Sequence, residues 1–125
     1  MGKSYAAKYD VETIAGYVVD KCIKMNRPIT NTQLQRMLFF IQKWYLKHGT
    51  IAFDADFVAQ PCGPICLPAY YKYSGYGAME IDMPETNTEN IDKEDAKIID
   101  EIIEEKLALS PFPFALSKEV CKKGG

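Results

Sequence analysis

The stretch TNTQLQRMLFFIQKWYLKHG, residues 30–49, decides the fold. Its large apolar residues recur at helical spacing and fill a broad arc, wider than one packed neighbour requires. Thr30 and Gln33 have the spacing of a capping box, and Gly49 is a typical end. We therefore expect a central helix from Thr30 to Gly49 that contacts several elements at once. Its apolar arc holds Leu34, Met37, Leu38, Phe40, Ile41, Trp44, Tyr45 and His48.

The opposite arc of this helix mixes polar and apolar residues. Phe39 and Leu46, seven residues apart, fall on it and do not fit a solvated face. Two interpretations stay open. Another segment of the same chain covers both residues, or they form an exposed apolar stripe that receives a partner helix or strand. The polar members of the arc are Gln35, Arg36, Gln42, Lys43 and Lys47.

The remaining helices are predicted from spacing and end signals. A first helix is expected from Asp10, its N-cap, to Met25, with Asn26 and Pro28 as the stop. Another is expected from a cap at Asn90 or Asp92 to about Leu107, packed on the central helix. The apolar stripe of this last helix consists of Ile91, Ile98, Ile99, Ile102 and Ile103.

The segment between these helices contains turns and short strands. The run Phe57–Ala59 predicts a brief strand, and Met79–Ile81 is expected to pair with it. The turn 61–64 ends in Pro64, whose fixed φ suits the first position of a helix reaching Tyr73. Residues 84–90 are expected to form a mobile loop, and residues 110–125 to hold at most one helical turn. We expect a mainly α fold with minor β: a compact bundle of about four to five helices and a short strand pair.

Length and composition indicate one domain. A chain of 125 residues, 47% hydrophobic, can bury one sizeable core, and we expect residues 1–125 to form a single domain with flexible ends at 1–9 and 118–125. A net charge of −2 gives no general attraction to nucleic acid or anionic lipid. No segment has the apolar length of a membrane span, and the start lacks the apolar core of a secretion signal, so we expect a cytoplasmic protein.

Several of these residues carry a resemblance to a known family. LQRMLFFIQ at 34–42 with WYL at 44–46, then Gly63-Pro64-Ile65 and Tyr70, and YSGYG at 73–77, resemble the Panacea domain, also described as the antitoxin SocA-like domain and earlier as phage-associated proteins of unknown function. The similarity spans roughly Ile14 to Gly77. The motifs are individually weak, and their combined spacing is the specific part.

The resemblance implies a compact, mainly helical antitoxin of a toxin–antitoxin system, often found in prophage or mobile regions. Such a protein binds its toxin directly, and the toxin is expected from the adjacent gene. The chain departs from the family at its C-terminus, where the family commonly has a Thr-His pair and a Pro-Trp. Here the sequence reads Pro-Phe-Pro-Phe and later Lys-Lys-Gly-Gly.

The four cysteines and the single histidine are the candidates for redox, metal or base chemistry. Cys62 and Cys66 are separated by three residues, whereas a redox dithiol uses two at a helix N-terminus after a strand. Cys62, Cys66, His48 and Cys121 lack the paired spacing of a zinc site. His48 stands alone as a candidate base and suits the end of a helix as a structural cation. We expect no catalytic residue, cofactor or metal.

The sequence thus favours a non-enzymatic binding module over two alternatives. One is a small prophage-encoded regulator associated with nucleic acid, for which the helix 30–49 is too apolar to act as a recognition helix. The other is an enzyme of unidentified class. Trp44 and Phe40 are assigned to the core. The residues expected to contact the toxin are Arg36, Phe39, Leu46, Tyr70, Tyr73 and Tyr76.

Overall fold

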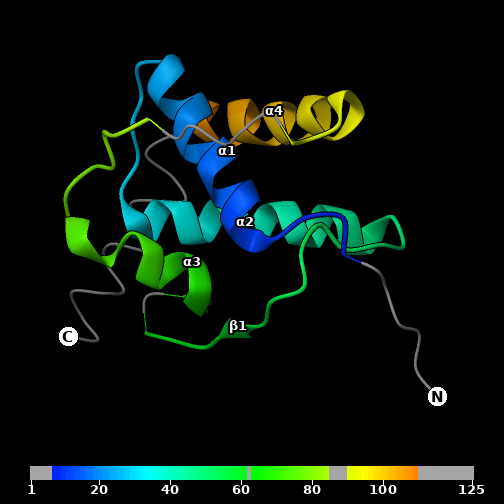
Figure 1. Ribbon diagram of the computed structural model, residues 1–125, viewed down its shortest axis with the longest axis horizontal. Coiled ribbons are helices and arrows are strands. Elements are labelled where there is room, and N and C mark those ends of the chain that lie inside the picture. Colours follow the sequence, from blue (N-terminus) through cyan, green and yellow to red (C-terminus); the bar gives the residue numbers. More distant parts are fainter. Residues whose placement is uncertain (1–6, 62, 85–89, 110–125) are drawn as a thin grey trace.

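The computed structural model describes residues 7–61, 63–84 and 90–109, which form a mainly helical fold with a two-stranded antiparallel sheet (Figure 1). This confirms the expected fold class. In chain order the elements are α1 (Val11–Lys24), α2 (Asn31–Lys47), β1 (Phe57–Val58), β2 (Ile65–Cys66), α3 (Leu67–Lys72), the 3₁₀ turn η1 (Ser74–Tyr76) and α4 (Lys93–Ala108).

Helix α2 is the central helix, as its sequence predicts. Figure 1 shows it running through the middle of the molecule, with α4 alongside and α1 crossing in front, and it also contacts β2 and α3. Its N-terminus has the expected capping box: the backbone N–H of Gln33 donates to Thr30 Oγ1 over 3.2 Å, and the N–H of Thr30 donates to Gln33 Oε1 over 2.9 Å. These bonds satisfy two groups that a helix end leaves without intrahelical partners.

Helices α1 and α4 complete the helical layer around α2. Asp10 is the N-cap residue of α1, and Asn26 follows the helix with a positive φ of 60°, the left-handed conformation that ends many helices. Asp92 is the N-cap residue of α4. The Tyr17 hydroxyl donates to Asp100 over 2.7 Å and ties the two helices together at their surface.

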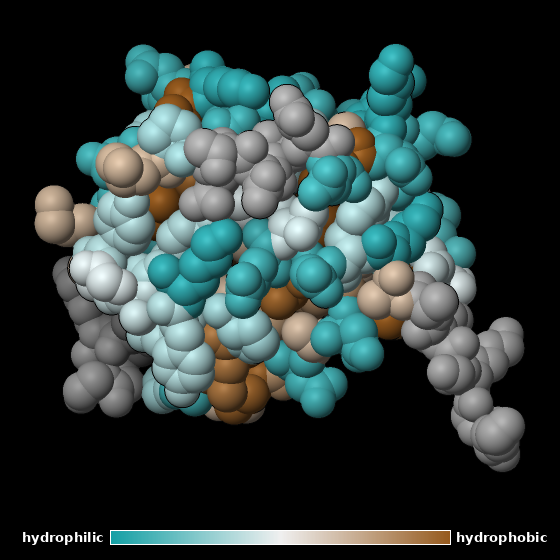
Figure 2. All heavy atoms as spheres, in the orientation of Figure 1, coloured by the Kyte–Doolittle hydropathy of each residue, from teal (hydrophilic) through white to brown (hydrophobic). Residues whose placement is uncertain are grey.

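The core lies where these helices meet the irregular segments. Its fully buried large side chains come from α1, α2 and α4 and from the loops around them, including Phe53 and Ile81. Phe40 and Trp44 are half-buried and pack against this core, in keeping with their assignment. In Figure 2 the visible face is largely hydrophilic, and its hydrophobic atoms form small separate groups, one of them at the lower edge.

The strand pairing differs from the prediction. β1 forms at Phe57–Val58 as expected, but it pairs with β2 in an antiparallel hairpin, so that Phe57 faces Cys66 and Val58 faces Ile65. Pairing between β1 and residues 79–81 was therefore a wrong prediction. Glu80 instead forms an isolated bridge with Thr30, next to the N-terminus of α2. The short loop of the hairpin closes at a smaller entropic cost than a return from residue 79 would.

The start of the third helix was also predicted wrongly. Pro64 does not open it, because the next two residues, Ile65 and Cys66, are extended and belong to β2. The helix α3 begins at Leu67 and has Pro68 in its first turn. A proline does occupy the first turn of this helix, as predicted, but it is Pro68 and not Pro64.

Some predictions concern residues that the structure does not describe. They are the mobile loop at residues 85–89, the helical turn within residues 110–125, and the flexible ends at residues 1–6 and 118–125. Residues 7–9 are described, and the backbone N–H of Tyr9 donates to the carbonyl of Ala52 over 2.9 Å.

Candidate functional site

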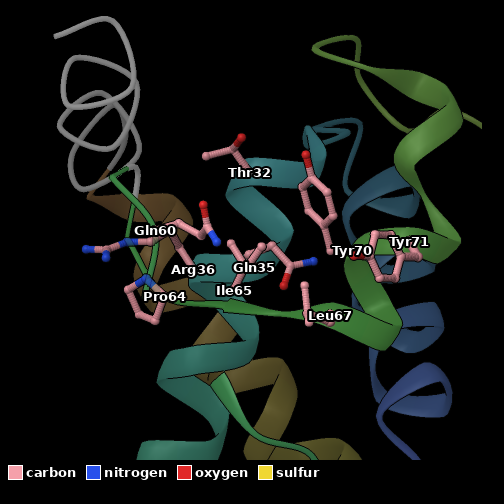
Figure 3. Close-up of a pocket in the computed structure, with 9 residues that line it drawn as sticks. All are labelled: Thr32, Gln35, Arg36, Gln60, Pro64, Ile65, Leu67, Tyr70 and Tyr71. Carbon is pink, nitrogen blue, oxygen red and sulfur yellow. The ribbon is translucent and has the colours of Figure 1, made fainter. Parts of the chain in front are cut away.

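A groove of about 330 Å³ lies between the N-terminal half of α2, the β hairpin and α3 (Figure 3). Its volume falls at the lower end of the range of small-ligand sites, about 300–1,000 Å³. In Figure 3 the guanidinium of Arg36 lies beside Pro64, across the groove from Tyr70 and Tyr71. The groove thus has a cationic end and an aromatic end. Its lining residues are Thr32, Gln35, Arg36, Gln60, Pro64, Ile65, Leu67, Tyr70 and Tyr71.

Buried amides hold the walls of the groove in place. Gln35 is only 1% exposed, and its Oε1 accepts a hydrogen bond from the backbone N–H of Cys66 over 2.7 Å. Gln35 Nε2 donates to Asn31 Oδ1 over 3.1 Å, and Asn31 Nδ2 donates to the carbonyl of Tyr70 over 3.0 Å. One chain of side chains on α2 therefore satisfies backbone groups in both β2 and α3, and it fixes their positions relative to α2.

A second buried glutamine repeats this arrangement two turns further along α2. Gln42 donates through Nε2 to the carbonyl of Phe53 over 2.7 Å and accepts at Oε1 from the N–H of Ala52 over 2.8 Å. Gln35 and Gln42 lie on the mixed arc predicted for this helix, and the backbone at Ala52, Phe53 and Cys66 covers both amides. The backbone N–H and C=O groups buried against this face need hydrogen-bond partners, and the two glutamine amides provide them.

Phe39 lies between the two glutamines on α2. It decides whether the mixed arc is covered by the same chain or exposed at this position. It is half-buried, and its ring meets that of Phe57 edge to face, with 5.5 Å between centroids. Another segment of the same chain therefore covers Phe39. Leu46 remains 51% exposed at the far end of α2, so the two residues do not form a continuous exposed stripe.

Arg36 is the charged side chain of the groove. Its guanidinium carbon lies 5.7 Å from the centroid of the Phe40 ring, a cation–π distance. On another side it approaches the hairpin turn so closely that a Cβ on Gly63 would stand 3.0 Å from Arg36 Nη1. Gly63 also has a φ of +115°, a conformation that favours glycine. The Nε–H of Arg36 is buried without a hydrogen-bond partner in the described residues.

The other residues expected to contact a partner are dispersed. Tyr70 lines the groove with Arg36, and Phe39 packs beneath the hairpin. Tyr73 is 3% exposed and belongs to the core, where its ring lies 6.4 Å from that of the half-buried Tyr76. The structure brings Arg36 and Tyr70 together, along with Tyr71 and Leu67, which the sequence analysis did not single out. No sequence signal marks Tyr71, because the helical spacing joins Tyr70, Tyr73 and Tyr76 and leaves it out; its side chain is 65% exposed.

The described cysteines and His48 take structural positions. Cys66 is buried, and burial raises the pKa of its thiol, which disfavours the reactive thiolate. Cys62 and Cys121 lie outside the described residues. His48 was expected on the apolar arc but is exposed; it stacks on Trp44 with 3.7 Å between centroids, and its Nδ1–H donates to the carbonyl of Trp44. Within the described ranges, no three His, Cys, Asp or Glu side chains are grouped to hold a metal ion.

Asp95 is a buried carboxylate that the sequence analysis missed. It accepts from the hydroxyls of Tyr45 over 2.5 Å and Tyr9 over 2.7 Å, and Lys8 Nζ lies 3.1 Å away. Burial alone would raise the pKa of Asp95, but these hydrogen bonds and the ammonium hold it below its usual range. Burial raises the pKa of Tyr9 to about 12. With both carboxylate oxygens bonded, this cluster ties the segment before α1 to α2 and α4.

Two further findings bear on function. No helix in the described part of the chain has both the length and the apolar character needed to cross a membrane. The chain matches no family model, and no match was found among curated proteins or solved structures.

Proposed function

We propose that this chain is a non-enzymatic, antitoxin-like binding domain that neutralises a toxin protein by direct contact, and that the groove between α2 and α3 is its main contact surface. The single observation that carries the proposal is the composition of this groove. It combines Arg36, Tyr70 and Tyr71 with aliphatic side chains. Arginine and tyrosine are among the residues that contribute most to the free energy of binding at protein interfaces.

The rigidity of the groove supports the same proposal. Binding costs less free energy when the binding surface is already ordered. Here the walls are fixed by the hydrogen bonds of Gln35 and Asn31, which are both buried. The resemblance of residues 34–46 and 63–77 to the Panacea domain supports the antitoxin role, and it directs the search for the toxin to the adjacent gene.

A nucleic-acid-associated regulator has less support. A recognition helix needs a row of exposed polar side chains that reach base edges. On α2, Gln35 and Gln42 are buried against the chain's own backbone. In the described part of the chain the groove lining carries a single cation, Arg36, which is too little for binding dominated by phosphate contacts.

Co-expression tests the proposal. The protein from the adjacent reading frame is produced in a bacterial host with and without this chain, and growth and co-purification are measured. We expect the adjacent protein to arrest growth alone, and this chain to restore growth and to co-purify with it. An adjacent protein that does not arrest growth, or an arrest that this chain does not relieve, would refute the antitoxin role.

Two matched variants locate the contact surface. Tyr71→Asp places a charge in the groove, and Met79→Asp places the same charge outside its lining. Both parent side chains are mostly exposed, so both variants should fold. We expect Tyr71→Asp to weaken co-purification and neutralisation, while Met79→Asp leaves them unchanged. Equal behaviour of the two variants would assign the contact to another surface.

A further inference from the structure

We infer that the groove recognises a carboxylate, carried by a short segment of the partner protein next to an apolar side chain that enters between Tyr70 and Leu67. This inference rests on the proposed function for the identity of the partner. It adds the chemistry that the partner must present.

Arg36 has no acidic partner in residues 7–61, 63–84 and 90–109. The ion pairs found within these residues join Lys8, Lys21 and Lys24 to carboxylates of the chain, and none includes Arg36. Among the described residues, the lining of the groove contains no Asp or Glu. A guanidinium has five N–H donors in a planar fork that matches a carboxylate. In Arg36 the Nε–H is already removed from water, and no described residue provides an acceptor for it.

The position of the guanidinium is constrained before any ligand arrives. The Phe40 ring lies on one side of it, and the backbone of Gly63 lies close to Nη1. Arginine loses less conformational freedom on forming a bond when its planar group is already oriented. Gly63 lacks the Cβ that would crowd this guanidinium, so the hairpin turn leaves room for it at the edge of the groove.

The opposite end of the groove suits an apolar side chain. Leu67 and the ring of Tyr70 form its wall, and Tyr70 and Tyr71 meet edge to face with 6.0 Å between centroids. Thr32 and Gln60 lie between the two ends in Figure 3, where a hydroxyl and an amide can bond to the backbone of a bound segment. A groove with one cation at one end and an apolar wall at the other fits an Asp or Glu beside a hydrophobic residue. Its volume of about 330 Å³ holds only a short segment.

Selection from a random dodecapeptide library displayed on phage tests this recognition without the toxin. The library is selected on the immobilised full chain, after depletion on the Arg36→Met variant, which keeps an apolar stem and removes the guanidinium. We expect the enriched peptides to share an Asp or Glu adjacent to an aliphatic or aromatic residue. Failure to enrich any peptide, or enrichment of peptides without a carboxylate, would overturn the inference.

Affinities of one enriched peptide then assign the contact. Its synthetic form and its Asp→Asn or Glu→Gln counterpart are titrated by calorimetry against the wild type, Arg36→Met and Lys43→Met. Lys43 is an exposed cation of α2 outside the groove lining, so its variant removes the same charge elsewhere. We expect the amide peptide and Arg36→Met each to weaken binding at least about tenfold, with no further loss in combination, because the two changes remove one charge-assisted contact. Lys43→Met should stay within about twofold.

The outcomes separate this inference from the proposed function. If Arg36→Met neutralises the toxin fully and binds the peptide as the wild type does, carboxylate recognition is wrong while the antitoxin role stands. If the peptide behaves as expected and no toxin is neutralised, the antitoxin role is wrong while the groove remains a peptide site. Circular dichroism and thermal unfolding check that Arg36→Met is folded. If it is not, Arg36→Lys, which keeps the charge but loses the fork, must weaken peptide binding for the inference to survive.

Discussion

Gln35 accepts a hydrogen bond at its side-chain oxygen from the backbone N–H of Cys66, over 2.7 Å and away from water. This contact joins the central helix to the strand that borders the groove. The other end of the same amide continues through Asn31 to the backbone of Tyr70. The position of both groove walls relative to α2 therefore depends on one buried side chain.

Gln35→Leu is expected to lower the free energy of unfolding by about 1–3 kcal/mol. Leucine has a similar size, but it leaves the N–H of Cys66 and the side-chain oxygen of Asn31 buried without their partners, and each lost partner costs a desolvation penalty. Urea unfolding followed by circular dichroism measures the change. Gln60→Leu, at an exposed position of the same groove, should change stability by less than about 0.5 kcal/mol. Equal stability of the wild type and Gln35→Leu would show that this bridge is dispensable.

The sequence predicted the helices because their signals are local. Apolar spacing gave α1, α2 and α4, and the Thr30–Gln33 pair gave the capping box, since the interacting residues lie within one turn of each other. The arcs of α2 were harder to assign. A helical wheel shows which residues share a face but not which segment covers it. Gln35 and Gln42 are covered by the backbone at Ala52, Phe53 and Cys66.

The groove was predictable only in part for the same reason. Arg36 and Tyr70 were named from their types and from the resemblance, and they meet in space. Tyr73 was named with them, but its direction depends on where α3 begins, and a two-residue strand moved that start from Pro64 to Leu67. Leu67 and Tyr71 are lining residues because of the way α3 packs against α2, which the sequence alone does not show.

Phe39→Ala and Leu46→Ala should have very different effects on stability, although both residues occupy the same mixed arc. Phe39 packs against Phe57, so its truncation removes an aromatic contact and leaves a cavity, and we expect a loss of about 2 kcal/mol. Leu46 is half exposed, and its truncation should cost less than about 0.5 kcal/mol. Thermal unfolding of both variants measures the difference. A similar loss in both would mean that Leu46 is covered in solution.

Asp95→Asn is expected to destabilise the fold by about 2–3 kcal/mol. The asparagine keeps the shape of the side chain but removes the charge that accepts from Tyr9 and Tyr45 and pairs with Lys8. Chemical denaturation measures the loss. Glu94→Gln is the matched control, because it removes an exposed carboxylate from the same first turn of α4 and so isolates the effect of the helix dipole. Equal changes in the two variants would assign the effect to the dipole instead of the buried cluster.

Acid should destabilise this protein through the same carboxylate. The pKa of Asp95 is lower in the folded protein than its ordinary value of 3.8, so the unfolded chain takes up the proton first as the pH falls. The free energy of unfolding therefore falls from about pH 4 downward, and this contribution is fully lost only below the folded pKa. One proton gives a slope of up to about 1.4 kcal/mol per pH unit. Urea titrations between about pH 2 and 6 measure the slope. Because Asp95→Asn has no carboxylate at this position, its stability should fall less steeply over the same range, and an identical slope would mean that other acidic groups control the acid response.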